Sequence, residues 1–143
     1  MKQYQTIHLV TSEDLNVHGT LFAARAASWF VESAFIAAAC TFGKTDEMVC
    51  RNVHGMEFTR PVNNGEMVSF VGRVVRVGET SMTTAVEVTS ELTGVSILVG
   101  FVTFVTIDES TGKKKPHNIT LDPTIDPKEL ELRNSASQLF EKN

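Results

Sequence analysis

The polar side chains best suited to chemistry lie in and just before one long apolar segment of the chain. Residues 20–41 hold many alanines and no glycine or proline, and only Arg25, Ser28 and Glu32 strongly interrupt the apolar surface. Spacings of three and four residues would place these side chains on one narrow stripe of a helix. Asn16 stands before the segment, at the end of a run of turn-forming residues, 11–16. A carboxylate and an amide so arranged can move a proton or orient a water molecule.

Each of these side chains also has a structural interpretation. Asn16 is suited to an Asx turn that shapes the loop before the helix. Glu32 is suited to a pairing with Arg25 or Ser28 on a solvated stripe, or to a subunit contact. His18 precedes a glycine near the helix start, where a single histidine is more often a local hydrogen-bonding residue than a catalyst. The residue types alone leave these alternatives open.

Several other kinds of chemistry have no motif in the chain. The sequence contains no G-x-S-x-G elbow, no phosphate-binding loop and no G-x-G-x-x-G fingerprint, so it offers no support for a serine hydrolase, a nucleotide hydrolase or a dinucleotide-binding protein. The histidines and cysteines have no spacing that suggests a metal site. We therefore expect no metal and no resident cofactor. Cys40 and Cys50, as two lone cysteines, are expected to be small buried hydrophobic residues.

Length and charge narrow the function further. The chain has 143 residues and a formal net charge of -4, so it should form one domain and lacks the clustered basic residues of a nucleic-acid-binding protein. The longest uncharged stretch, 92–107, is too short to span a membrane as a helix and is expected to be a buried strand. No apolar signal core follows the first residues. We expect a cytoplasmic protein with no membrane or nucleic-acid partner.

The elements that position the polar residues can be predicted from periodicity and turn signals. Residues 20–41 should form a helix that ends at Gly43 and, being apolar almost all round, is enclosed by other structure. Five stretches should form strands, and the glycine-containing turns between the last four predict an antiparallel meander. The expected strands are 5–10, 49–58, 66–77, 81–92 and 95–107. The result is an α+β domain whose sheet curls around the helix.

The end of the chain differs in composition. Asp126, Pro127 and Glu129 match the N-cap, first residue and capping-box acid of a helix that should extend to about Phe140. Because this segment is polar, the helix is expected to lie on the surface.

Five short stretches together resemble the hotdog-fold acyl-coenzyme A (acyl-CoA) thioesterases. They include a D-x-N-x-x-G entry to the central helix and an F-x-x-P-V-x-x-G turn, in the family's order and spacing over residues 7–110. The stretches are EDLNVHGTLF (13–22), WFVE (29–32), MEFTRPVNNGE (56–66), VRVGETS (75–81) and FVTFV (101–105). The resemblance implies a hotdog domain over residues 1–112, with residues 113–143 as a C-terminal extension of the same domain.

The resemblance also implies roles for individual residues. In the family, an acid on the central helix acts as general base or nucleophile, and backbone N–H groups at the helix start hold the oxyanion. The corresponding residues are Asn16, beside the scissile carbonyl, and Ala23, which with Ala24 occupies the place of two family glycines. The family's acid falls on Val31, so Glu32, one residue further, is the only nearby candidate base. A turn of about 100° per residue separates the directions of these two side chains.

The resemblance also implies which residues contact the nucleotide end of CoA. The positions that match the family's contacts are Arg60, Gly78, Thr80 and Ser81. The lysine run 113–115 has no counterpart in the family and is expected to be a solvated hairpin. The resemblance thus implies an acyl-CoA hydrolase that works as a homodimer or larger homo-oligomer, with each pocket between subunits. The alternative is a catalytically impaired hotdog protein that binds acyl-CoA or another acyl ligand without cleaving it.

Overall fold

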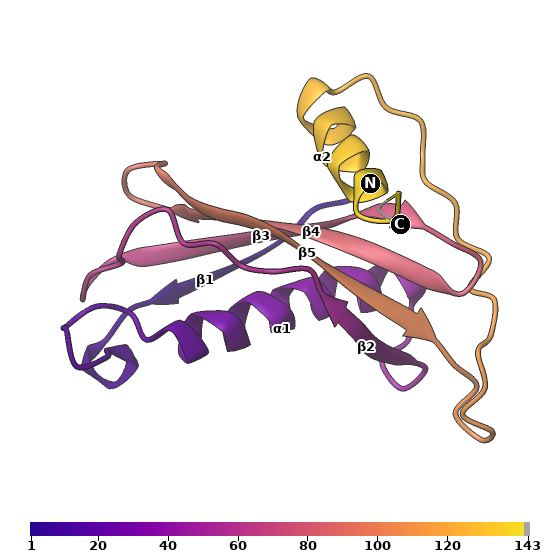
Figure 1. The fold of residues 1–143 in the computed structure, drawn as a ribbon, viewed down its shortest axis with the longest axis horizontal. Coiled ribbons are helices and arrows are strands. Elements are labelled where there is room, and N and C mark those ends of the chain that lie inside the picture. The colour runs from indigo at the N-terminus through magenta and orange to yellow at the C-terminus, as the bar shows by residue number, and fades with distance from the viewer. Residues whose placement is uncertain (142–143) are drawn as a thin grey trace.

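The computed structural model describes residues 1–141 as one sheet and two main helices (Figure 1). All five strands pair antiparallel, in the order β1-β3-β4-β5-β2. The elements are β1 (Tyr4–Leu9), the short 3-10 helix η1 (Ser12–Asp14), α1 (Ala23–Phe42), β2 (Met48–Val53), β3 (Met67–Val77), β4 (Ser81–Ser90), β5 (Ser96–Thr106) and α2 (Pro127–Gln138).

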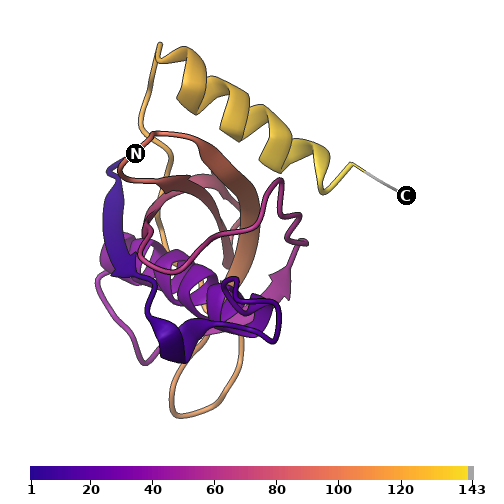
Figure 2. The same cartoon turned by 90° about the vertical axis from the view of Figure 1, so that its left-hand side faces the viewer.

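The sheet curls around α1, as Figure 2 shows, and the core lies between them. Phe30, Ala34 and Ala38 of α1 are fully buried against the strands. The helix comes so close to β3 that a Cβ at Gly72 would lie 3.1 Å from Ala37 Cβ, and glycine permits this approach. The predicted α+β architecture and hotdog fold are confirmed.

The central helix begins three residues later than predicted. Thr20 and Leu21 form isolated β-bridges with Asn63 and Leu15, which keeps their backbone extended. The predicted end is confirmed, because Gly43 follows Phe42 with a φ of 95° and donates its N–H to Ala39 O at 2.7 Å. At the other end of the helix, the bridge between Thr20 and Asn63 ties the helix start to the chain that precedes β3.

The expectation that α1 is enclosed all round is wrong for a single chain. Arg25, Ser28, Glu32 and Cys40 are exposed along one side of the helix, which the sheet does not reach. Cys50 is exposed as well, because β2 is an edge strand, so the prediction of two buried cysteines is also wrong. Periodicity indicates an apolar helix that is largely covered, but it could not say which side the chain's own sheet leaves exposed.

The predicted meander of four strands is also corrected. β2 does not pair with β3, to which the turn at 60–65 connects it, but with β5 at the edge of the sheet. β2 ends at Val53, and the rest of the predicted strand 49–58 runs as irregular chain along β5, with His54 N–H bonded to Phe101 O. This crossover brings residues 58–62 beside the start of α1, where Leu21 N–H donates to Val62 O at 2.8 Å.

The C-terminal helix α2 packs on the outer face of the sheet (Figure 2). Asp126 caps its start by accepting the Glu129 N–H, and Pro127 is its first residue, as predicted. The side chain of Glu129 is buried rather than closing a capping box, and it pairs with Arg73 and Arg133. Residues 142–143 of the predicted extension lie outside the described residues.

None of the helices in the described part of the chain is long and apolar enough to cross a membrane.

Candidate functional site

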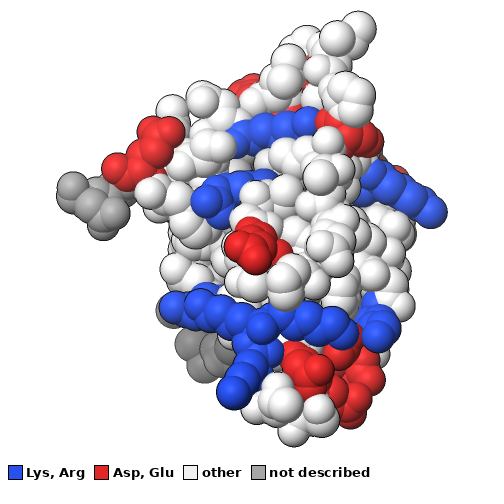
Figure 3. All heavy atoms as spheres, turned by 90° about the vertical axis from the view of Figure 1, so that its right-hand side faces the viewer, with Lys and Arg blue, Asp and Glu red and all other residues white. Residues whose placement is uncertain are grey.

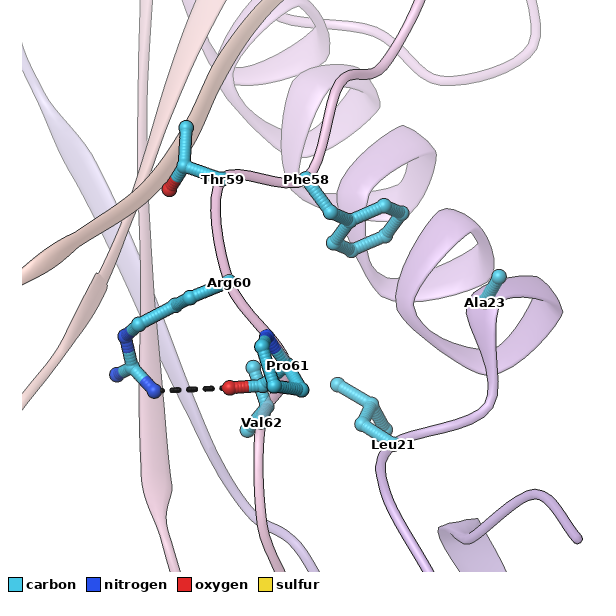
Figure 4. A pocket seen from close by; sticks show the side chains of 7 residues that line it. All are labelled: Leu21, Ala23, Phe58, Thr59, Arg60, Pro61 and Val62. Carbon is cyan, nitrogen blue, oxygen red and sulfur yellow. Dashed lines mark hydrogen bonds between the residues drawn. The ribbon is translucent and has the colours of Figure 1, made fainter. Parts of the chain in front are cut away.

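The best-defined cavity lies where α1 begins, and it has a volume of about 320 Å³. Figure 4 shows side chains from the helix entry on one side and from the crossover segment before β3 on the other. Its lining is mainly apolar and comprises Leu21, Ala23, Phe58, Thr59, Arg60, Pro61 and Val62. Ala23 and Arg60 are predicted site residues, whereas Leu21 and Phe58 are not, although the F-x-x-P-V motif contains Phe58.

The first turn of α1 begins beside this cavity, at Ala23, and leaves backbone hydrogen-bond donors without a helical acceptor. Arg25 and Ala26 donate to Phe22 O at 3.0 and 3.1 Å, whereas the N–H groups of Ala23 and Ala24 precede any possible helical acceptor. In the described chain, no side chain caps the helix start. These donors and the positive end of the helix dipole favour negative charge on an oxygen beside Ala23.

Asn16 shapes the loop that leads into the helix. Its Oδ1 accepts hydrogen bonds from His18 N–H at 2.8 Å and from Thr20 N–H at 3.1 Å, and its Nδ2 donates to Thr20 Oγ1 at 3.0 Å. The structure therefore contains the Asx turn that was one of the two interpretations of Asn16. Asn16 lines an apolar hollow with Leu15, Val17 and Phe22, and Phe22 directly precedes Ala23. A role beside a scissile carbonyl remains a prediction.

Glu32 and Ala23 lie on different sides of α1. Nine residues separate them, which corresponds to about half a turn in projection, and Glu32 borders a separate groove with His8 of β1. Val31 is half-buried and packs against the core. Arg25 pairs with Asp14 at 3.1 Å rather than with Glu32. Hydrogen bonds from Thr11, with a smaller contribution from Arg25, outweigh burial and lower the pKa of Asp14, so this carboxylate stays ionised.

The charge of Arg60 is partly offset inside the protein. Its Nη2 lies 2.9 Å from Glu66 Oε1, and its Nη1 donates to Pro61 O at 3.0 Å. The Arg60 guanidinium in turn holds the pKa of Glu66 below its usual value. A phosphate that binds Arg60 must share it with this carboxylate.

Gly78, Thr80 and Ser81 lie at the opposite end of the sheet from Arg60. Arg60 precedes β3 and Gly78 follows it, so the 11 residues of β3 separate them, a distance of about 36 Å. The C-terminal extension packs on this turn: His117 N–H donates to Glu79 O at 3.3 Å, and His117 Nε2 donates to Ser81 O at 2.9 Å. Nε2 carries the proton because Nδ1 accepts the Ile119 N–H.

Figure 3 views the molecule from the side of this turn. Lys and Arg side chains form bands on that side, interrupted by Asp and Glu. Lys113 and Lys114 are exposed in the hairpin after β5, and Lys115 pairs with Glu47 at 3.0 Å. One chain therefore carries Asn16 and Ala23 at one end and most of the predicted nucleotide contacts at the other, while Glu32 lies midway along α1.

Solved structures with the same architecture include acyl-CoA hydrolases and thioesterases. An acyl-CoA hydrolase from Bacillus cereus is 26% identical, with a TM-score of 0.84 over 97% of this chain and 84% of its own. A hexameric acyl-CoA thioesterase is 28% identical, with a TM-score of 0.84 over 97% and 88%. The Staphylococcus aureus acyl-CoA hydrolase, solved with butyryl-CoA and CoA, is 24% identical, with a TM-score of 0.86 over 97% and 82%, and supports the fold alone.

No curated protein sequence matches the chain significantly. The family model of the thioesterase superfamily matches residues 18–97, which include the helix entry, α1, the crossover segment and the turn at 78–81. Because this match covers more than half of the chain and the fold agrees with it, the protein belongs to the thioesterase superfamily.

Proposed function

We propose that the protein hydrolyses acyl-CoA thioesters at the start of α1. The observation that carries the proposal is an apolar cavity of about 320 Å³ that opens beside the unpaired N–H groups of the helix start. The cavity suits an apolar part of the ligand, and the Ala23 N–H stabilises the oxyanion that forms when water attacks the thioester carbon. A donor of this kind contributes about 10²–10³-fold to turnover. Asn16 orients the reacting group.

Glu32 is left out of this catalytic assignment because it borders the groove on the other side of the helix from Ala23. The active oligomer contains at least two copies, since the separation of Ala23 from Gly78, Thr80 and Ser81 within one chain requires the nucleotide contacts to come from another copy. The hexameric state of one matched thioesterase supports a homo-oligomer here.

A second candidate is an acyl-CoA-binding protein that has lost catalysis. The observation that favours it is Val31, which holds the place of the family's acid and packs half-buried against the core. Such a protein would keep the helix N-terminus and the cavity but would bind the ester without cleaving it.

The two candidates are distinguished by offering the purified protein acyl-CoA esters of increasing chain length while the released thiol is followed optically. Hydrolysis is expected for at least one ester and should be reduced by Phe58→Arg, which fills the cavity with charge. CoA binding without thiol release across the panel would contradict hydrolysis and support the second candidate. In that case Val31→Asp, compared with Val31→Asn, should raise turnover by about 10²–10⁴-fold, the usual effect of a general base.

A further inference from the structure

The loop between η1 and α1 is closed as a short antiparallel ladder. Asp14 O accepts the Phe22 N–H at 2.8 Å, and Asn16 N–H donates to Thr20 O at 2.7 Å. The two residues between these contacts form a β-bridge with each other. Because Ala23 directly follows Phe22, the ladder fixes the position of the Asn16 amide relative to the Ala23 N–H.

Asp14, at the base of this ladder, is also held by its side chain. Its Oδ2 accepts the Thr11 N–H at 2.9 Å and the Thr11 hydroxyl at 3.1 Å, and its Oδ1 lies 3.1 Å from Arg25 Nη1. Asp14 is 6% exposed, and an acidic residue is rarely buried to this extent unless it is paired. A single residue therefore joins η1, the loop and the first turn of α1.

Arg25 occupies an unusual position for a cation. It lies in the first turn of α1, which contains no acid, and a positive charge near a helix N-terminus opposes the helix dipole. Asp14 supplies the missing negative charge from outside the helix. The two residues from Ala23 to Arg25 turn the side chain by about 200°, so Arg25 borders the groove beside His8 rather than the cavity. The ion pair therefore acts on the site through the position of the backbone.

We infer that Asp14 and Arg25 form a clamp that holds the Asn16 amide and the Ala23 N–H in one fixed arrangement. The two are positioning residues, because the cavity is lined by other side chains. Without the clamp, the ladder has only its own few hydrogen bonds to keep the loop in place against the helix. A displacement of about 1 Å in a reacting group can reduce turnover by about 10²-fold.

The test removes each partner of the clamp separately and follows thiol release, so this part of it rests on the proposed function. Asp14→Asn keeps an oxygen for the Thr11 N–H but removes the negative charge, and Arg25→Gln removes the positive charge. Each should lower kcat by about 10–100-fold and leave KM nearly unchanged, because the reacting groups move while the rest of the ester binds as before. The double variant should be no slower than the slower single variant, since the clamp is lost only once. Arg25→Lys, which keeps a cation, should recover part of the turnover.

The signs of the two effects distinguish positioning from a direct electrostatic effect on the oxyanion. If the charges acted on the oxyanion directly, Asp14→Asn would raise turnover by leaving an unopposed cation near the helix start, and Arg25→Gln would lower it by leaving an unopposed anion. A clamp requires both variants to lose turnover. A rise in turnover in Asp14→Asn would therefore overturn the inference.

Hydrogen exchange detects the clamp without hydrolysis. Exchange of the Phe22 N–H, which Asp14 O accepts, should accelerate in both clamp variants, whereas exchange of the Gly43 N–H at the other end of α1 should not change. Glu13→Gln removes the same charge from the exposed neighbour of Asp14 and should leave turnover and exchange unchanged. Thermal melting and light scattering check that each variant is folded and assembled. If Asp14→Asn fails to fold, the Arg25 variants carry the test, because the Arg25 side chain is 45% exposed.

Losses of turnover that multiply in the double variant, or single variants as active as Glu13→Gln, would also contradict the clamp. The two proposals fail separately. Accelerated Phe22 exchange in a protein that hydrolyses none of the esters contradicts the proposed function alone, and hydrolysis with unchanged Phe22 exchange in both clamp variants contradicts the clamp alone.

Discussion

At the scale of single residues, Asn16 serves the architecture of the site. Its Oδ1 accepts two backbone N–H groups of the loop that leads into α1, so its amide is held in a fixed orientation. The alternatives that the sequence left open, an Asx turn and a contact with the substrate, are compatible, because a side chain fixed by the loop is also preorganised for a ligand.

Asn16→Asp should separate these two roles. The aspartate keeps an oxygen for the His18 and Thr20 N–H groups, so the melting temperature should change little, but it replaces the Nδ2 donor with negative charge beside the developing oxyanion. We expect kcat to fall by about 10²–10³-fold, the effect of losing one preorganised donor. Turnover and thermal melting are measured on the same samples, with Asn64→Asp in the exposed turn before β3 as the control.

A fall in melting temperature together with full turnover in Asn16→Asp would show that the residue acts on the loop alone.

At the scale of elements, α2 is held on the sheet by buried charge as much as by apolar contact. Leu132 and Ala136 pack on Val75 and Ala85, while Glu129 lies 3.0 Å from Arg73 Nη1 and 2.9 Å from Arg133 Nη2. A buried pair of this kind contributes little net stability but is costly to break, because it leaves a charge unpaired. It therefore fixes where the helix docks.

Glu129→Ala should lower the free energy of unfolding by about 3–5 kcal/mol, since Arg73 would lose a buried partner. Because Arg73 also pairs with Glu87, the lower end of that range is expected. Urea denaturation provides the measurement, and Glu131→Ala, at an exposed position of the same helix, should change the value by less than about 0.5 kcal/mol. Equal effects of the two substitutions would contradict the role assigned to the buried pair.

The docking of α2 should also depend on pH. Burial raises the pKa of the Glu129 carboxyl, but hydrogen bonds from the Met1 ammonium, Arg73 and Arg133 outweigh it, and the pKa is lowered. A carboxylate with a lowered folded-state pKa adds stability that is complete above its unfolded pKa of about 4.3 and is lost as the pH falls through the folded value. The protection of the α2 amides against hydrogen exchange, measured relative to the intrinsic exchange rate at each pH, should therefore fall below this pH in the unmodified protein, and this pH dependence should be smaller in Glu129→Gln.

At the scale of the whole molecule, the predicted site residues other than Glu32 are divided between two ends of the sheet. The helix start and Arg60 lie at one end of β3, and the turn at 78–81 lies at the other, packed against the C-terminal extension. A ligand that contacts both sets must bind between copies, in agreement with the oligomer under the proposed function.

Complementation between two disabled copies tests this arrangement. One copy carries Phe58→Arg in the cavity and the other carries Ser81→Arg at the distant turn, and each alone should be impaired. Random pairing should restore about a quarter of the original sites, because half of the dimers are mixed and each mixed dimer contains one intact site. Recovery of thiol release after unfolding and refolding the mixture is the readout, and no recovery would indicate that each site lies within one chain.

The sequence by itself determined the elements and their order. The alanine-rich helix, the β-branched strands, the glycine-containing turns and the capped C-terminal helix depend on local propensity and periodicity, which neighbouring residues decide. The motif spacing was sufficient to identify the fold. The helix end at Gly43 could be predicted because glycine readily adopts the left-handed backbone that ends a helix, and Gly43 has this backbone in the structure.

Only the tertiary structure decided which elements meet. That β2 pairs with β5, that Phe58 lines the cavity beside Ala23, that Glu32 borders a different groove, and that Glu129 is buried all depend on contacts between residues distant in sequence. Periodicity predicts that one side of an element will be covered, but it does not name the covering partner.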